Sequence, residues 1–338
     1  MSISVLKPGM LSTVQDLGRY GMQHLGIVPC GAMDEVSHRI ANALVGNDEA
    51  APTLEITLRG PTLQFDHDVL LALQGADFDA RADGTPVPRG RPVALRAGAR
   101  LDCGSAKQGC RAYLAFAGGI DVPDVLGSAS TYVPAGFGGH EGRALRAGDR
   151  LPLSAHAEAL AVRRTAMLRS HGPTRVVEGM TSVTWRAPDL TLPVGDEIRL
   201  HAMAGRNTDL FEDAALDAFF GTQWRVLADS NRMGFRLGGP ELQRRQPGDI
   251  LSEPTCLGTV QVPADGAPIV LMADHQTTGG YAKIAEVAGA DIPRLAQAAP
   301  GAVLRFGRID TPIADALRGV LEHQMAALRR TLAWQYAE

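Results

Sequence analysis

The sequence lacks the features that mark membrane, secreted and nucleic-acid-binding proteins. No apolar run approaches the roughly 20 residues that a transmembrane helix needs, and the first residues, Met1 to Lys7, lack the basic start and apolar core of a signal peptide. The 33 basic and 37 acidic residues give a net charge of −4 and are mixed along the chain, which predicts no nucleic-acid partner. We therefore expect a cytoplasmic protein with no membrane contact.

Cysteines and the common catalytic motifs are also scarce. The four cysteines, at positions 30, 103, 110 and 256, show no zinc-site spacing, and a disulfide framework is not expected in a reducing cytosol. The sequence has no phosphate loop of the form G-x-x-x-x-G-K-[ST], no G-x-S-x-G elbow and no H-E-x-x-H motif. It also has no Met-Lys-Met segment of the type that carries biotin. We predict no metal site and no ordinary phosphate-binding loop.

The sequence is instead rich in short β-strand patterns. Its 338 residues are enough for two domains. Segments rich in Val, Leu and Thr end at Gly, Pro or Asp, which favours barrels or sandwiches over a doubly wound sheet. The clearest predicted strands are Thr53–Leu58, Val69–Gln74, Val93–Leu95, Tyr113–Ala117, Glu197–His201 and Ile269–Met272.

Three helices are predicted from their capping residues. The first begins after Asp34, the second begins after Thr208 or Asp209 and ends at Gly221, and the last begins near Asp310. Each has apolar residues spaced along one face, as expected for a helix that packs on a core.

A linker divides the chain in our interpretation. The segment from Ser154 to His171 is rich in Ala and Arg and carries no strand pattern. We therefore predict an N-terminal lobe over residues 1–160, a C-terminal lobe over 161–309 and a C-terminal helix over 310–338.

Two polar segments are candidate binding segments. Gln15, Asp16 and Arg19 lie among glycines, and a carboxylate and a guanidinium at this spacing can hold each other while they offer donors to a ligand. A locked N-terminal turn explains them equally well. Asn231 and Arg232 lie between two predicted strands, where polar residues are most often an ordinary turn. The guanidinium of Arg232 can also hold a carboxylate or phosphate.

The third polar segment is the richest. A buried strand, Ile269–Ala273, leads directly into it, and loops at strand ends often hold catalytic groups. Histidine can transfer protons near neutral pH, aspartate can fix its tautomer or act as a base, and paired glycines let backbone N–H groups approach a substrate oxygen. We predict a catalytic site at Asp274, His275, Gln276, Thr277, Thr278, Gly279, Gly280, Tyr281 and Lys283.

Several of these segments together resemble a known family. They are Thr13–Arg19, Gly31–Asp34, Leu54–Leu58, Ser230–Gly234, Gln261–Pro263 and Ala273–Tyr281, within residues 5 to about 306. The chain resembles the KipA family, which is associated with the C subunit of the bacterial ATP-dependent 5-oxoprolinase. The same domain type occurs as the allophanate hydrolase subunit 2 domain, within the carboxyltransferase region of urea carboxylase. The chain departs from the family at Pro29-Cys30-Gly31, where Pro-x-Gly-Gly is usual, and between His171 and Ile198.

The resemblance implies a mainly β fold of two cyclophilin-like β-barrel lobes in tandem, with a few helices and the C-terminal helix. It also implies two partners, a KipI-like B subunit and a LamB/YcsF-like A subunit. Together they would use ATP, with Mg, to open the small cyclic amide 5-oxoproline to glutamate. Because this chain has no phosphate loop, we expect the partner to bind ATP wholly or partly.

Under this mechanism, Arg232 and Lys283 would neutralise anionic groups, and Asp274 or His275 would take the lactam proton. Gln276, Thr277, Gly279 and Gly280 would hold the imidate, and Gln15, Asp16 and Arg19 would line the facing lobe. Two other functions fit the family. One is carboxyl transfer from biotin, on a separate carrier, to urea or a related amide. The other is a regulatory protein that binds and neutralises a KipI-like kinase inhibitor.

Overall fold

The computed structural model describes residues 1–193, 195–246, 248 and 250–337. The chain is mainly β and divides into two compact units. Unit 1 comprises Met1–Gly18, Asp34–Leu192 and Gln324–Glu338, and unit 2 comprises Arg19–Met33 and Pro193–His323. The predicted domain ranges 1–160, 161–309 and 310–338 stay a prediction. The compact units change between Leu192 and Pro193, and the N-terminal segment contributes to both units.

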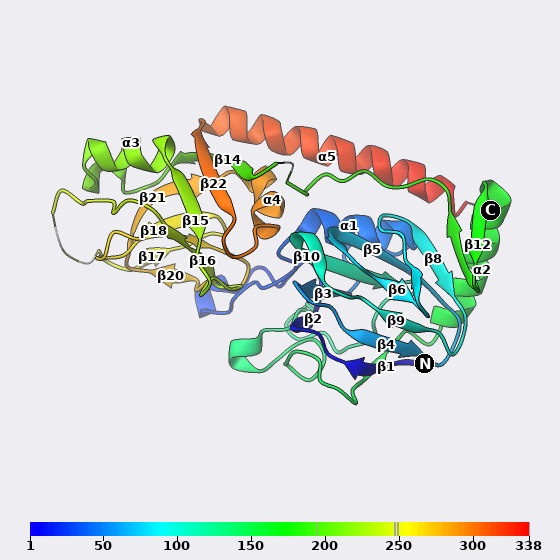
Figure 1. The fold of residues 1–338 in the computed structure, drawn as a ribbon. Helices are drawn as coiled ribbons and strands as arrows, with labels where there is room; N and C mark the ends of the chain where they lie inside the picture. The colour runs from blue at the N-terminus through cyan, green and yellow to red at the C-terminus, as the bar shows by residue number, and fades with distance from the viewer. Residues whose placement is uncertain (194, 247, 249, 338) are drawn as a thin grey trace. The chain divides into compact units, whose positions relative to one another are not determined.

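Unit 1 contains two antiparallel sheets around one hydrophobic core (Figure 1). Apolar side chains from both sheets, such as Phe65 and Leu114, meet in this core. The six-stranded sheet has the order β11 (Arg150–Pro152), β1 (Ser2–Lys7), β4 (Thr62–Phe65), β9 (Arg100–Asp102), β6 (Arg81–Ala82), β7 (Thr85–Pro86). The seven-stranded sheet has the order β12 (Thr174–Val177), β13 (Met180–Val183), β8 (Pro92–Leu95), β5 (Val69–Phe78), β10 (Ala106–Phe116), β3 (Thr53–Thr57), β2 (Leu11–Gln15).

Two helices and a 3-10 turn, η2 (Val133–Ala135), accompany these sheets. Helix α1 (Glu35–Leu44) packs on β5 and β10, and the Asp34 carboxylate caps it by accepting from the Ser37 backbone N–H at 2.9 Å. The predicted start of this helix is confirmed. The linker prediction is wrong, because residues 157–171 form helix α2 (Ala157–His171). Ala and Arg favour a helix, but only three of its residues are buried, so the sequence shows no clear apolar stripe.

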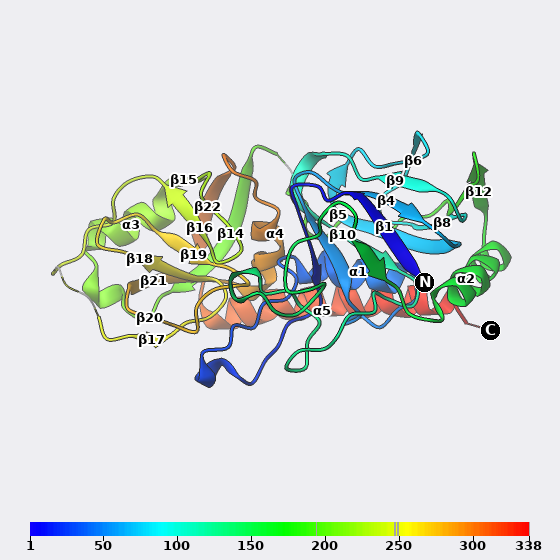
Figure 2. The ribbon, with the colours of Figure 1, turned by 90° about the horizontal axis from the view of Figure 1, so that it is seen from below.

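Unit 2 is built on a closed seven-stranded barrel. The aromatic side chains of Trp224, Phe235 and Phe306 help to fill its core. Around the barrel the strands follow the order β14 (Glu197–Ala204), β21 (Ala282–Val287), β18 (Thr259–Val262), β19 (Ile269–Leu271), β16 (Gly234–Gly238), β15 (Gln223–Val226), β22 (Val303–Arg308). A separate two-residue ladder joins β17 (Glu253–Pro254) to β20 (Thr278–Gly279), and both strands lie beside β18 and β21 in Figures 1 and 2.

The short helical elements of unit 2 are α3 (Asp213–Gly221), α4 (Ile292–Ala296), η1 (Gln23–Leu25), η3 (Thr208–Leu210) and η4 (Gly289–Asp291). The predicted start of the second helix at Thr208 or Asp209 is wrong. Those residues form the 3-10 turn η3, and α3 begins at Asp213, whereas its predicted end at Gly221 is confirmed.

The last helix, α5 (Thr311–Trp334), begins at the predicted position. Its residues up to His323 belong to unit 2, and those from Gln324 belong to unit 1. In unit 1 the chain end packs on α1, where the Tyr336 hydroxyl donates to the Leu44 carbonyl. Within the described part of the chain, no helix combines the length and the apolar character needed to cross a bilayer.

Candidate functional site

The richest polar segment of the sequence lies in unit 2, at the end of β19. Backbone hydrogen bonds continue beyond the paired strands β16 and β19. The Met272 N–H donates to the Met233 carbonyl at 3.0 Å. The Asp274 N–H donates to the Arg232 carbonyl at 2.8 Å. These bonds hold the segment after β19 beside the turn before β16. The backbone therefore brings together two polar segments that are 42 residues apart in the sequence.

The side chains of Arg232 and Asp274 form a buried, two-pronged ion pair. Arg232 Nε donates to Asp274 Oδ2 at 2.9 Å, and an Arg232 terminal nitrogen donates to Oδ1 at 2.8 Å. The same nitrogen donates to the Gly31 carbonyl at 2.7 Å. Both side chains are more than nine-tenths buried. A planar guanidinium held in this way has a fixed orientation, which suits it to anion recognition.

Cys30 lies beside this ion pair. Its φ is +59°, a left-handed conformation that few non-glycine residues adopt, and its side chain is buried. Burial, followed by the nearby Asp274 carboxylate, raises the pKa of the Cys30 thiol to about 12. The thiol therefore stays protonated at neutral pH and is a weak nucleophile. Cys30 directly precedes Gly31, which also has a positive φ of +92° and whose carbonyl accepts from Arg232.

His275 follows Asp274 and is 4% exposed. Its Nδ1 lies 2.7 Å from the Gln276 carbonyl oxygen, so Nδ1 carries the proton and Nε2 is left as the basic nitrogen. The Thr255 hydroxyl also lies 3.3 Å from Nδ1. Burial lowers the pKa of His275 below its ordinary value. The imidazole is therefore neutral at pH 7 and can accept a proton at Nε2.

Gln276 and Gly279 lie against Gln261, a residue of β18. The Gln276 amide donates to Gln261 Oε1 at 3.3 Å. A Cβ atom at position 279 would lie only 2.5 Å from Gln261 Nε2, so a larger residue there would require the Gln261 side chain to shift. Among the described residues, Gln261 Nε2 is a buried donor with no hydrogen-bond partner.

Lys283 is 2% exposed and makes an ion pair with Glu253, whose side chain is about one-third exposed. Lys283 Nζ donates to Glu253 Oε2 at 2.9 Å, and the Lys283 backbone N–H donates to the Asn207 side chain at 3.0 Å. The hydrogen bond from Lys283 lowers the pKa of the Glu253 carboxyl group. An anionic ligand that reaches Lys283 would therefore compete with Glu253 for the ammonium group.

The other predicted residues of this region are more exposed to solvent. Asn231 is exposed, and its side chain accepts from the Met233 N–H at 2.8 Å, as in an ordinary turn. The Thr277 carbonyl accepts from the Thr255 N–H at 3.0 Å. The rest lie at or near the surface: Thr278 and Tyr281 are exposed and Gly280 is partly buried.

The predicted N-terminal segment is divided between the units. Gln15 and Asp16 belong to unit 1, and Arg19 belongs to unit 2. The Asp16 carboxylate accepts from the Gly18 and Ala129 N–H groups and from the hydroxyls of residues 128 and 130. Gln15 donates to the Thr13 hydroxyl and the Thr131 carbonyl at 3.1 and 3.2 Å. The Asp16 carboxylate therefore has a structural role: it joins the loop after β2 to the loop at residues 128–130 of unit 1.

Sequence reasoning missed five residues that the structure places at this site: Cys30, Gly31, Glu253, Thr255 and Gln261. Gly31 and Gln261 lie in segments that carry the family resemblance, which is the one signal that pointed towards them. Glu253 and Thr255 lie in a polar loop with no motif. Their roles depend on the β17–β20 pairing, which no local pattern predicts.

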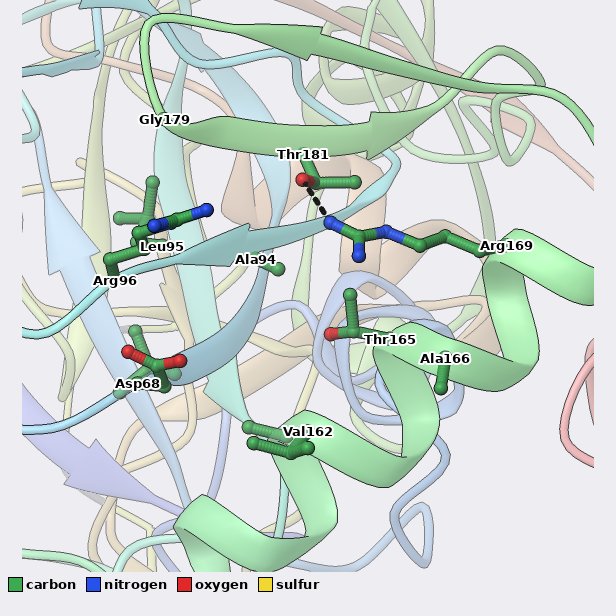
Figure 3. A pocket seen from close by; sticks show the side chains of 12 residues that line it. Asp68, Ala94, Leu95, Arg96, Val162, Thr165, Ala166, Arg169, Gly179 and Thr181 are labelled. Atoms are coloured by element: carbon green, nitrogen blue, oxygen red, sulfur yellow. Dashed lines mark hydrogen bonds between the residues drawn. The ribbon is translucent and has the colours of Figure 1, made fainter.

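Unit 1 contains a pocket of its own. It has a volume of about 360 Å³ and lies between α2 and the strands β8 and β13. Arg169 donates to the Thr181 hydroxyl at 3.0 Å, and Asp68 and Arg96 lie across from helix α2 (Figure 3). None of the predicted site residues lines it. In the described part of the chain, no group of three or more His, Cys, Asp or Glu side chains has the arrangement of a metal site.

Comparison with known proteins identifies the family. Residues 25–308 match the family model of the carboxyltransferase domain, subdomain A and B. The chain belongs to this family. The match covers the barrel of unit 2, the Arg232–Asp274 pair and most of unit 1.

The C subunit of 5-oxoprolinase from Escherichia coli is 40% identical to this chain over 333 residues, which cover 98% of each chain. The C subunit of 5-oxoprolinase from Haemophilus influenzae is 37% identical and covers 97% of this chain and 98% of its own length. The solved urea carboxylase of Kluyveromyces lactis superposes with a TM-score of 0.86 at 30% identity and covers 97% of this chain. The chain spans 29% of that enzyme, so it corresponds to one part of a larger protein.

Proposed function

We propose that this chain is the C subunit of an ATP-dependent 5-oxoprolinase, which opens 5-oxoproline to glutamate. The supporting observation is the extent of the match to the two bacterial proteins, which covers nearly the full length of both chains in each comparison. Similarity over nearly the whole of both chains favours the same place in the same kind of complex.

The name of those relatives supports an enzyme of several subunits. We propose a KipI-like B subunit and a LamB/YcsF-like A subunit as the partners, in the cytoplasm. The site in unit 2 then acts on a small cyclic amide that the assembled complex holds.

His275 is the proton acceptor in this proposal. Both oxygens of Asp274 accept hydrogen bonds from Arg232, so Asp274 serves to orient the guanidinium. The neutral His275 ring has its Nδ1 directed to the Gln276 carbonyl and its Nε2 available for the lactam N–H proton. Arg232, fixed by Asp274 and Gly31, offers a cation of defined orientation to an anionic group.

ATP supplies the phosphoryl group that makes the amide carbon electrophilic. The chain contains no phosphate loop, so the residues present do not form an ordinary nucleotide site. We therefore assign ATP, with Mg, wholly or partly to the KipI-like partner. The contribution of this chain is to bind the amide, orient it and accept its proton.

The test is ATP hydrolysis that depends on 5-oxoproline, measured with the purified chain and its two companion proteins. We expect turnover only with all three proteins, and a large loss with His275→Ala. A complex that binds 5-oxoproline but shows wild-type turnover with His275→Ala would remove His275 from the chemistry. No turnover by the complete wild-type complex would refute the proposed function.

A second candidate function is carboxyl transfer from biotin to urea or a related amide. The family model and the superposition on urea carboxylase favour it. The chain has no biotin-carrying segment, so this function needs a separate carrier. Streptavidin blotting of proteins that co-purify with the chain from its host distinguishes the two functions, because only carboxyl transfer needs a biotinylated partner.

A further inference from the structure

The outer face of the barrel carries a polar row where β18 pairs with β21. Val260 and Val262 point into the barrel core, so the alternate residue Gln261 points outward. The strand register places Gln261 opposite Lys283, whose neighbours Ala282 and Ile284 also belong to the core. These two polar side chains therefore stand side by side on the outer face.

The β17–β20 ladder covers this polar row. Glu253 of β17 bonds to Lys283, and Gly279 of β20 lies against the Gln261 amide. The ladder consists of only two residue pairs, Glu253 with Gly279 and Pro254 with Thr278. Two more backbone bonds extend it, from the Thr255 N–H to the Thr277 carbonyl and from the Ile250 N–H to the Gly280 carbonyl. Each strand of the ladder pairs on one side, whereas each barrel strand pairs on both sides, so the ladder separates at lower cost than a barrel strand. Its opening would expose both polar side chains.

The hydrogen bonds of Gln261 are incomplete. The side chain is 1% exposed, and its Oε1 accepts from Gln276. In the described residues, its Nε2 has no acceptor. Leaving a buried amide N–H without an acceptor is costly, so such a donor calls for a partner such as a ligand, an ion or a water molecule.

The cation beside this donor is already occupied by an internal carboxylate. Lys283 Nζ bonds to Glu253 Oε2 at 2.9 Å, and Glu253 comes from the covering ladder rather than from the barrel. Glu253 thus occupies the position that a carboxylate ligand would take. Displacing it leaves an ammonium and an amide N–H on adjacent strands, a pair of donors suited to the two oxygens of one carboxylate.

We propose that Gln261 and Lys283 form a carboxylate-binding subsite under the β17–β20 ladder, with Glu253 as the internal competitor. The inference rests on the proposed function and sharpens it, because the subsite favours amides that carry a carboxylate. 5-Oxoproline has this group, whereas urea and uncharged lactams lack it. Gln261 is a substrate-binding residue in this scheme, and His275 remains the proton acceptor.

The experiment measures binding and steady-state kinetics of the complete complex with 5-oxoproline and with 2-pyrrolidinone, the same ring without the carboxylate. Gln261→Glu keeps the shape but removes the donor and adds a charge. We expect its KM and Kd for 5-oxoproline to rise about tenfold or more with a smaller change in kcat, and its weak affinity for 2-pyrrolidinone to stay unchanged. Gln64→Glu, on an exposed position of β4, is the matched control with wild-type values.

Glu253→Gln provides a result of opposite sign. Removing the competing carboxylate should lower the Kd for 5-oxoproline severalfold, which damage to the fold cannot imitate. If the Glu253→Gln complex binds 5-oxoproline no tighter than wild type, Glu253 does not compete with the substrate carboxylate. A wild-type complex that turns over 5-oxoproline while Gln261→Glu keeps the wild-type KM would overturn the subsite and leave the proposed function standing. Absence of wild-type turnover defeats the proposed function itself.

Discussion

Asp16 and Asp274 are both buried aspartates that follow a strand, yet their surroundings differ. Asp16 accepts hydrogen bonds from neutral groups, which are backbone N–H groups and serine hydroxyls of its own unit. Asp274 pairs with the guanidinium of Arg232 and orients it. The first arrangement closes two loops, and the second fixes a cation. Polar density alone does not separate a structural clasp from a site, whereas the identity of the partners does.

Two buried histidines also differ in their hydrogen-bond partners, one with a structural role and one with a role in the site. In unit 1, His38 has Nδ1 2.8 Å from the Thr53 hydroxyl and Nε2 3.4 Å from the Asn42 amide, so both ring nitrogens have partners. In unit 2, the hydrogen bonds of His275 involve Nδ1. Burial lowers the pKa of both rings. We therefore expect His38 to control stability and His275 to control activity.

The largest expected effect is on catalysis by His275. In the assembled complex, His275→Gln should lower kcat/KM for 5-oxoproline by about 100- to 10,000-fold, the usual contribution of a general base. His38→Gln, assayed per mole of folded protein, should keep near wild-type kinetics. Comparable losses in the two variants would remove the distinction between the histidines.

The pH profile sharpens the same comparison. Because burial places the pKa of His275 below its ordinary value of 6.5, the ring is neutral at pH 7 and activity should be flat there. As pH falls through that lowered pKa, protonation of Nε2 should decrease kcat/KM by about tenfold per pH unit. In His275→Gln, the residual activity should lack this acid limb.

The second prediction concerns the ion pair. Arg232→Ala leaves the Asp274 carboxylate buried without its cation, and we expect a loss of about 3–5 kcal/mol in the free energy of unfolding. Urea titration of the purified chain measures it. A loss below about 1 kcal/mol would show that the pair is far better hydrated than its burial indicates.

The third prediction concerns His38 and acid stability. Burial lowers the pKa of His38 to about 4, whereas the unfolded chain has the ordinary value of 6.5. Between these values the unfolded state binds the proton and the folded state does not, so stability falls as pH decreases from 6.5 to about 4. The loss amounts to about 3 kcal/mol. Urea titrations from pH 7 to pH 4 should show a shallower decline in His38→Gln than in wild type.

The smallest effect is expected for the exposed counterpart of the buried pair. Arg236 and Asp229 lie 3.0 Å apart, and both side chains are at least half exposed. Arg236→Ala should cost about 0–1 kcal/mol, because water and salt screen an exposed pair. The same urea titration compares it with Arg232→Ala. Equal losses would contradict the role of burial.

The sequence predicts much of this fold because its strand signals are local. Val-, Leu- and Thr-rich segments between turn residues place β3, β5 and β14, and Asp34 places the start of α1. Helix α2 escaped prediction because its apolar residues are too few to form an evident stripe. Local patterns fail where the apolar periodicity is weak.

The sequence likewise predicts only part of the site. Polar crowding after a buried strand pointed to Asp274 and His275, and the turn before β16 pointed to Arg232. The sequence does not pair Gly31 with Arg232, because 201 residues separate them. Nor does it place Gln261 opposite Lys283, because that register depends on an irregularity in the β18–β21 pairing.

The segment Arg19–Met33 interrupts unit 1 and completes unit 2, and this sets an order of assembly on the ribosome. Met33 joins a core whose strands are made only after residue 197. At about 5–20 residues per second, the segment waits on the order of ten to fifty seconds for the strand before Asp274 to be synthesised. Unit 1 in turn waits for the segment after residue 323, where Tyr336 donates to the Leu44 carbonyl. Unit 2 can therefore be finished once its main portion, up to residue 323, has been made, whereas unit 1 needs a segment made after its main portion. Early release of the nascent chain would leave unit 1 open.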